Sequence, residues 1–355
     1  MAQPLESVLM RRFVILSWLG ALLIGALGAP VAAYDGRSSL CAQSSGACLH
    51  GLPALQYQML LPQMLAHPKP NGRSVPVDAQ ALYRHSLYQI DPNGITLYDA
   101  PNGTPIASLP QGFIFVGMRQ QRDGWGEVRR GQWALLDQLR GVPASPFSGL
   151  IFDAPPAYPV AWVLQSAQPS STPNIPPEPN APVLARYTPV YVFATLNDGA
   201  QDWHLVAPAQ WLPARRLARL IPPLKPAGVK GRWIAVDLAQ QVLTAYEDDR
   251  LIFATLIASG RPETATGEGL FRIWARFRWD TLFGGSGADY YYLPSVPYVM
   301  YFDGEIALHG AYWHDNFGAQ HSQGCVNLSL SDARWLYEWT DNFFADTWVY
   351  VWRSK

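Results

Sequence analysis

Residues 309–314 read His-Gly-Ala-Tyr-Trp-His, and residues 321–328 read His-Ser-Gln-Gly-Cys-Val-Asn-Leu. These two segments hold three of the seven histidines and one of the three cysteines. A cysteine becomes a nucleophile near neutral pH when a neighbour lowers its pKa, and histidine is the usual neighbour. Gly324 lets the backbone before Cys325 approach a substrate and present N–H groups to it. We therefore expect the functional site here, with the rest of the chain supporting it.

Three interpretations of Cys325 are open on these residues alone. The first is a structural cysteine in an aromatic-rich core, because free cysteine is among the most buried residue types. The second is a zinc site, although the spacing matches no common zinc pattern. Its ligands would be His309, His314, His321 and Cys325. The third is a nucleophile with His309 as its base, which requires the intervening loop to fold back between adjacent strands.

The segment resembles the L,D-transpeptidase catalytic domain (the YkuD family). That family's signature is a histidine, a loop-length gap, then Ser/Thr-His-Gly-Cys, a hydrophobic residue and Asn. This chain has His309 and then Ser-Gln-Gly-Cys-Val-Asn at 322–327. Segments 236–241, 259–267 and 296–302 also look like that domain, so the resemblance covers about 230–352.

Gln323 is the main departure, since it stands where the family usually has histidine. The family's base is the upstream histidine, matched here by His309. The resemblance therefore implies that the base is retained. We expect Gln323 to alter the oxyanion hole or the rigidity of the loop.

The resemblance implies a role for each matching residue. Cys325 is the expected nucleophile, His309 the general base, and Gly310 a backbone orienter of that base. Backbone N–H groups of Gln323, Gly324 and Cys325 would form the oxyanion hole. The expected substrate-binding residues are Tyr298, Tyr301, Trp313, His321 and Asn327. No metal or other cofactor is expected.

Some of these substrate-binding roles have alternatives. The aromatic segment 290–301 is expected either to line a groove for an extended peptide or to pack in the core. Asn327 could instead fix the loop, and His321 could simply be exposed.

Composition limits the class of protein. The chain has 355 residues, a net charge of −1, 49% hydrophobic and 13% aromatic residues. It is therefore long enough for two or three domains with a core that needs no disulfide support. The balanced charge argues against a nucleic-acid partner.

Residues 1–33 are predicted to be a secretory signal peptide. Arg11 and Arg12 precede an apolar run at 13–29, and Pro-Val-Ala-Ala at 30–33 supplies small residues for cleavage after Ala33. The alternative is an uncleaved membrane anchor, the only membrane contact that we expect. Either predicts export to the periplasm or cell wall. There, Cys41 and Cys48 could form a disulfide, leaving Cys325 as the unpaired thiol.

The region 94–222 contains an internal repeat. Asp-Ala-Pro at 99–101 recurs at 153–155, an offset of 54, while Trp125 and its neighbours recur around Trp203, an offset of 78. We attribute the difference to a Pro-rich insertion at 165–182. The two copies look like bacterial SH3-like β-barrels, in which both tryptophans are either core residues or part of a shallow groove.

The predicted fold class is mainly β. The expected parts are a leader at 34–90, SH3-like repeats at 91–146 and 147–222, a linker at 223–230, and a β-sandwich-like catalytic domain at 231–353. In the leader, Leu55, Met59, Leu61 and Leu65 have near-helical spacing. Near the C-terminus, Ser331 is expected to cap a short helix before a closing strand at 347–352.

Four functions fit this sequence. The resemblance favours an exported transpeptidase that acts on peptidoglycan stem peptides. A carboxypeptidase that uses water as acceptor belongs to the same class. The third candidate is a cell-wall-binding protein with a degenerate catalytic domain. The fourth is a protein that binds zinc through His309, His314, His321 and Cys325.

Overall fold

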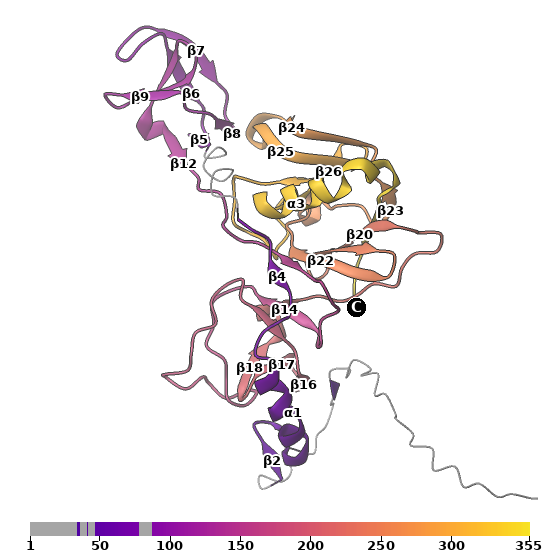
Figure 1. The fold of residues 1–355 in the computed structure, drawn as a ribbon. Helices are drawn as coiled ribbons and strands as arrows, with labels where there is room; N and C mark the ends of the chain where they lie inside the picture. The colour runs from indigo at the N-terminus through magenta and orange to yellow at the C-terminus, as the bar shows by residue number, and fades with distance from the viewer. Residues whose placement is uncertain (1–33, 36–40, 42–46, 78–86) are drawn as a thin grey trace, which may run out of the picture. The chain divides into compact units, whose positions relative to one another are not determined.

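The structure, a computed structural model, describes residues 34–35, 41, 47–77 and 87–355. The predicted signal peptide lies outside these residues. They are mainly β-structure, as predicted, and contain two α-helices, α1 (Ala54–Ala66) and α3 (Leu330–Thr340) (Figure 1). Cys41 and Cys48 form the predicted disulfide. Within the described segments, no helix combines the length and apolarity needed to cross a membrane.

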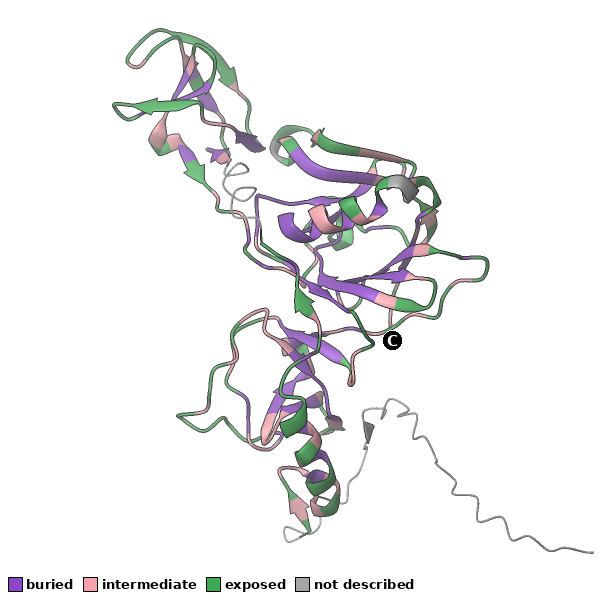
Figure 2. Cartoon of the chain, in the orientation of Figure 1, coloured by how far each residue is buried: buried purple, intermediate pink, exposed green. Residues whose placement is uncertain are grey.

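Two sheets form the C-terminal domain. The first has the strand order β23-β28-β20-β21-β22-β13-β4. Its bounds are β23 (Gly269–Arg272), β28 (Trp348–Trp352), β20 (Arg232–Asp237), β21 (Val242–Glu247), β22 (Arg250–Leu256), β13 (Leu150–Ile151) and β4 (Arg73–Ser74). The second contains β24 (Ala275–Gly284), β25 (Tyr291–Asp303), β26 (Ile306–Gly310) and β27 (Val326–Leu328). Ile234, Leu243, Met300 and Leu308 belong to one core cluster shared by the two sheets. Figure 2 shows buried segments in the strands of both sheets.

The N-cap of helix α3 lies two residues before the predicted cap. The side chain of Ser329 accepts a hydrogen bond from the Asp332 N–H at 3.2 Å, so Ser329 is the N-cap and Ser331 lies inside the helix. Ala333 and Leu336 are fully buried, and Trp335 and Trp339 pack partly buried against the same core cluster. These side chains form the apolar side of the helix.

The Asp332 carboxylate links α3 to two other segments. It accepts hydrogen bonds from the Thr255 hydroxyl at 2.6 Å and from the Gly149 N–H at 2.8 Å. Complete burial disfavours the charged form and raises the pKa of Asp332 to about 6, although the hydrogen bonds act in the opposite direction. One buried carboxyl thus ties α3, β22 and the segment before β13 together.

Two similar β-modules precede the C-terminal domain. The first module, residues 88–141, contains β5 (Tyr88–Ile90), β6 (Ile95–Tyr98), β7 (Pro105–Leu109), β8 (Phe113–Val116), β9 (Gln120–Arg122), β10 (Trp125–Arg129), β11 (Gln132–Leu135) and β12 (Leu139–Gly141). The second module, residues 160–219, contains β14 (Val160–Val163), β15 (Pro189–Tyr191), β16 (Ala194–Asn197), β17 (Asp202–Ala207), β18 (Gln210–Pro213) and β19 (Leu217–Arg219). Their relation to SH3-like domains stays a prediction.

The offset of 78 relates equivalent structures in these modules. The β10–β11 pair has a register shift between Glu127 and Arg129, and the β17–β18 pair has one between Leu205 and Ala207. A single 3-10 turn follows each pair, at 136–138 and 214–216. Trp125 and Trp203 are 7% and 8% exposed, which favours the core alternative over a groove.

The offset of 54 does not relate equivalent structures. Residues 99–101 lie at the turn between β6 and β7, whereas residues 153–155 precede β14. The Pro-rich run 165–182 lies between β14 and β15, where the first module has the β6–β7 hairpin between β5 and β8. It therefore replaces that hairpin, because proline lacks the N–H that a strand ladder needs.

The buried side of α1 also differs from the predicted one. Its buried side chains are Tyr57, Leu60 and Met64, whereas Leu55, Met59 and Leu65 are exposed. The remaining short elements are β1 (Tyr34–Asp35), β2 (Cys48–Leu49), β3 (Leu52–Pro53), η2 (Leu136–Gln138), η3 (Ala214–Arg216), η4 (Pro262–Thr264), η5 (Gly287–Asp289) and η6 (Asp341–Asp346).

Asp332 predicts a pH-dependent stability. Because the folded pKa exceeds the unfolded value, the wild type loses stability as pH rises through the range from about 4 to 6. Asp332→Asn removes this titration. Urea unfolding should show that the wild-type stability, relative to the variant, falls by about 2–3 kcal/mol from pH 4 to pH 7. Glu338→Gln, at an exposed position of the same helix, is the control, and an equal pH dependence in wild type and Asp332→Asn would contradict the prediction.

Candidate active site

Parallel pairing of β26 with β27 brings the two key residues into one region. His309 lies opposite Asn327 in this register, and the loop 311–325 returns the chain to the start of β27. Cys325 comes directly before that strand. Its sulfur accepts a hydrogen bond from the Ala307 N–H at 3.4 Å. The sequence separation of His309 and Cys325 is therefore closed by a parallel strand pair.

Hydrogen bonds fix the turn before Cys325. The Ser322 N–H donates to the Ser259 carbonyl at 3.0 Å, and the Ser322 hydroxyl donates to the Cys325 carbonyl. The Thr266 hydroxyl donates to the Gly324 carbonyl at 2.7 Å. These contacts anchor the turn to the segment 259–266, which is why both segments lie together in the folded chain.

The backbone donors of this turn are not all free. The Gly324 N–H donates to the Ser322 side-chain oxygen at 3.0 Å. The N–H groups of Gln323 and Cys325 have no protein acceptor among the residues that the structure describes. Gly324 has φ of +126°, a conformation that favours glycine. The turn thus leaves the donors on either side of Gly324 available to a ligand.

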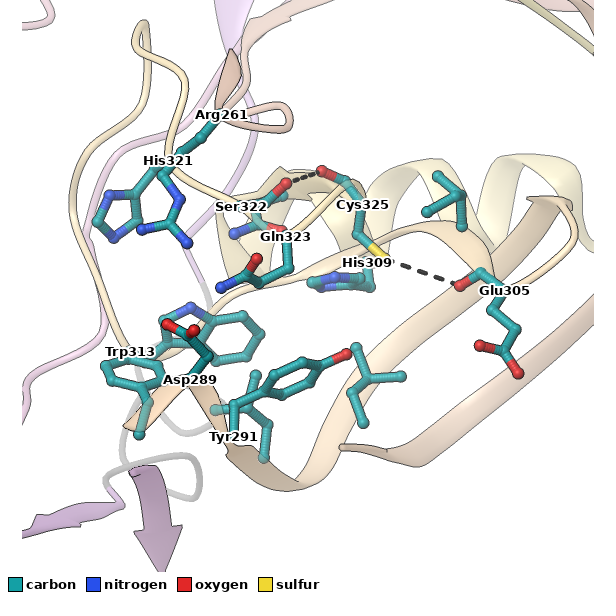
Figure 3. Close-up of a pocket in the computed structure, with 15 residues that line it drawn as sticks. Arg261, Asp289, Tyr291, Glu305, His309, Trp313, His321, Ser322, Gln323 and Cys325 are labelled. Atoms are coloured by element: carbon teal, nitrogen blue, oxygen red, sulfur yellow. Dashed lines mark hydrogen bonds between the residues drawn. The ribbon is translucent and has the colours of Figure 1, made fainter. Parts of the chain in front are cut away.

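Cys325 and His309 line the same pocket, of about 380 Å³ (Figure 3). Predicted site residues that also line it are Gln323, Trp313, His321 and Asn327. Those outside its lining are Gly310, Gly324, Tyr298 and Tyr301. Tyr298 is 5% exposed in the core, and the Tyr301 hydroxyl donates to Asp280 at 2.9 Å. The aromatic segment 290–301 therefore contributes partly to the pocket and partly to packing.

Several lining residues were not predicted to bind substrate. They are Phe113, Arg261, Leu282, Asp289, Tyr291, Leu293, Glu305, Ile306 and Ser322. Arg261 and Ser322 belong to segments that carried the family resemblance. Tyr291 was within the aromatic segment, but only the strand register shows which aromatic side chains reach the pocket. No sequence signal linked Phe113, almost two hundred residues upstream, to this site.

Burial sets the protonation states of Cys325 and His309. It raises the pKa of the Cys325 thiol to about 11 and lowers the pKa of His309 to about 4. The thiol donates a weak hydrogen bond to the Glu305 carbonyl at 3.9 Å, as Figure 3 shows. Nδ1 of His309 lies 3.4 Å from the Gly310 carbonyl oxygen. Both groups are therefore neutral at pH 7 in the unliganded pocket.

His314 and Asn327 hold the loop together beside the pocket. The Asn316 N–H donates to Nδ1 of His314 at 3.0 Å, which places the proton of the neutral ring on Nε2. Nε2 lies 2.8 Å from the Asn327 Nδ2 position, where the Nε2 proton requires an acceptor; turning the amide places its oxygen there, and that oxygen has no other partner among the described residues. Burial keeps His314 neutral by lowering its pKa to about 3.

His309, His321 and Cys325, three of the four residues considered as zinc ligands, line the same pocket but are not arranged as a metal site. Among the described residues, no group of three or more His, Cys, Asp or Glu side chains is arranged to hold a metal ion. His314 instead uses its nitrogens within the loop, and Cys325 makes its contacts with the β25–β26 turn.

The neutral states of Cys325 and His309 predict how the alkylation rate of Cys325 depends on pH. Because only the thiolate is alkylated, the rate of iodoacetamide labelling should rise about tenfold per pH unit from about pH 7 to pH 10, below the thiol pKa. Mass spectrometry of Cys325 after timed quenching measures this rate, with Cys325→Ala as the unlabelled control. A rate that is constant above pH 6 would instead indicate a preformed thiolate–imidazolium pair.

Residues 231–351 match the family model described as the L,D-transpeptidase catalytic domain, YkuD. No curated protein matches the chain.

Three of the matching solved structures are L,D-transpeptidases or their catalytic domains. An L,D-transpeptidase from Mycobacterium smegmatis is 22% identical, over 42% of this chain and 72% of that one, with a TM-score of 0.32. One from Stackebrandtia nassauensis is 30% identical, over 37% and 59%, with a TM-score of 0.30. The catalytic domain of the E. faecium enzyme is 29% identical, over 36% and 100%, with a TM-score of 0.31. Because these TM-scores are low, the assignment rests on the family match: the chain contains, at residues 231–351, a YkuD-type L,D-transpeptidase catalytic domain.

Proposed function

We propose that this chain is an exported transpeptidase that cross-links peptidoglycan stem peptides through a thioester on Cys325. The observation that carries this proposal is the pocket shared by the Cys325 thiol and the His309 imidazole, within the L,D-transpeptidase domain. A thiol beside a histidine, with free backbone N–H groups next to it, is suited to acyl transfer.

The first half-reaction acylates Cys325. His309 takes the thiol proton as the sulfur attacks an amide carbonyl carbon of the donor peptide. The Gly310 carbonyl accepts the His309 Nδ1–H and so leaves Nε2 as the basic nitrogen. The C–N bond breaks, the departing D-amino acid receives the proton from His309, and a thioester remains. Because the resting pair is neutral, proton transfer accompanies the attack.

Backbone donors stabilise the negative oxygen that forms in this step. The N–H groups of Gln323 and Cys325 have no protein acceptor in the described chain, and Gly324 between them adopts a positive φ. Peptide N–H groups require no side chain, so Gln323 can supply its donor although the family usually has histidine there. The same donors act again when the thioester is attacked.

The second half-reaction transfers the acyl group to an amine. The acceptor nitrogen attacks the thioester carbonyl, the C–S bond breaks, the amine loses a proton and Cys325 regains one. Asp289 and Glu305 line the pocket with exposed side chains, and neither forms an ion pair in the part of the chain that the structure describes. Two unpaired carboxylates attract an ammonium-bearing acceptor peptide, which favours an amine over water.

Export is supported from two directions. The signal-peptide pattern at 1–33 predicts secretion, and the Cys41–Cys48 disulfide is typical of an oxidising compartment. Peptidoglycan also lies outside the cytoplasm. We therefore place the reaction in the periplasm or cell wall, with stem peptides as the partners.

The reaction is tested with protein that begins at Tyr34 and a purified disaccharide-tetrapeptide. Mass spectrometry of wild-type products should show a cross-linked dimer with release of one terminal D-amino acid. Cys325→Ala should lower product formation at least a thousandfold, because the nucleophile is lost. Gln323→His should retain cross-linking. A tripeptide as the sole product would indicate a carboxypeptidase, and activity in Gln323→His alone would indicate a degenerate natural site.

The Glu305 carboxylate is expected to influence whether an amine or water attacks the thioester. Glu305→Gln should lower the ratio of dimer to hydrolysed tripeptide severalfold, because the pocket attracts the cationic acceptor less strongly. The effect should weaken as salt is raised. Glu178→Gln, at an exposed position in the second module, is the charge-matched control. An unchanged ratio in Glu305→Gln at low salt would exclude this electrostatic role.

A further inference from the structure

Strand β8 of the first module pairs with a strand of the catalytic domain. Its Phe113 and Ile114 lie opposite Tyr291 and Tyr292 of β25, in parallel register. The Phe113 N–H also donates to the Tyr290 carbonyl at 2.8 Å. The module thus continues the sheet that carries the active site, although it lies outside the residues matched to the catalytic family.

The alternation of side chains along β8 divides its two faces. Ile114 and Val116 are buried in the core of the first module. Phe115 faces the other way and is fully buried, with its ring 5.7 Å from that of Tyr312 in the loop after His309. Phe113 lies on the same face as Phe115, 5.1 Å away, and lines the pocket. One strand therefore joins a module core to the catalytic pocket.

Gly112 allows this close approach. Its φ is +139°, and a Cβ at this position would lie 2.3 Å from the Tyr290 carbonyl oxygen. Any other residue would push β8 away from β25. The strand that presents Phe113 is thus positioned by a backbone contact that only glycine permits.

We propose that Phe113, supplied by the first module, is a substrate-binding residue that forms an apolar wall of the pocket beside Cys325. The proposal rests on the proposed function, because the donor is the stem peptide that acylates Cys325. Phe113 is 36% exposed, so its ring retains surface that a ligand can cover. Leu282 and Leu293 line the same pocket. Together these side chains favour an aliphatic portion of the donor peptide, while the polar residues of the pocket contact its charged groups.

A direct binding measurement tests this wall. In a full-length mature chain that carries Cys325→Ala, calorimetry with the disaccharide-tetrapeptide gives the Kd without turnover. Adding Phe113→Ala should weaken binding about tenfold, since part of a phenyl contact is lost. Phe113→Leu should give an intermediate value. Phe283→Ala, which removes an exposed phenyl ring from β24 outside the pocket lining, should leave Kd unchanged.

Kinetic measurements on protein that retains Cys325 distinguish the loss of a binding contact from a general distortion of the active site. Phe113→Ala should raise KM about tenfold with little change in kcat, as expected for lost uniform binding. Its iodoacetamide labelling rate at Cys325 should equal that of wild type. Equal Kd values for Phe113→Ala and its parent would overturn the proposal, as would a parent that does not bind the tetrapeptide. Binding by the parent without any product from the wild type would leave the wall intact and reject the proposed reaction.

Discussion

The parallel pairing of β26 with β27 is the constraint on which the site depends. It places His309 opposite Asn327 and brings Cys325 back beside Ala307 after a long loop. This register of three residue pairs therefore decides whether His309 and Cys325 share a pocket. A shift by one residue would turn His309 to the other face of the sheet. The contacts from Ser259 and Thr266 to the turn before Cys325 oppose such a shift, because they fix the turn from another segment of the domain.

Burial of the site also keeps the Cys325 thiol and the His309 imidazole uncharged. The apolar surroundings raise the pKa of Cys325 to about 11 and lower that of His309 to about 4. A separated thiolate and imidazolium would each lose solvation here, so charge is best formed when a substrate carbonyl and the backbone donors can stabilise it. A thiol that stays protonated until substrate arrives is also protected from oxidation, since oxidants act on the thiolate. Such protection would suit the export that we propose for this chain.

Local patterns in the sequence predicted much of the fold, whereas features that depend on long-range register were missed. The domain core, the helix after the cysteine and the repeat with an offset of 78 follow from short-range periodicity and similarity. The offset of 54 misled because a short Asp-Ala-Pro match can arise in any turn-rich segment. Along β25, left-handed residues such as Ser295 and Tyr298 interrupt the alternation of faces. Leu293 and Val296 therefore belong to the same core cluster, although a simple period of two would place them on opposite faces of the sheet.

The edges of the catalytic sheets explain why segments upstream of the family match matter to the domain. Strand β22 pairs with β13, and β25 pairs with β8, although β13 and β8 lie upstream of the family match. Without these partners, two strands of the domain would present unpaired N–H and C=O groups. No residue of β13 lines the pocket, whereas β8 pairs with the first two residues of β25 and adds Phe113 to the lining. The same strand therefore covers a strand end and contributes to the pocket, which gives a single physical reason for the module to remain joined to the catalytic domain.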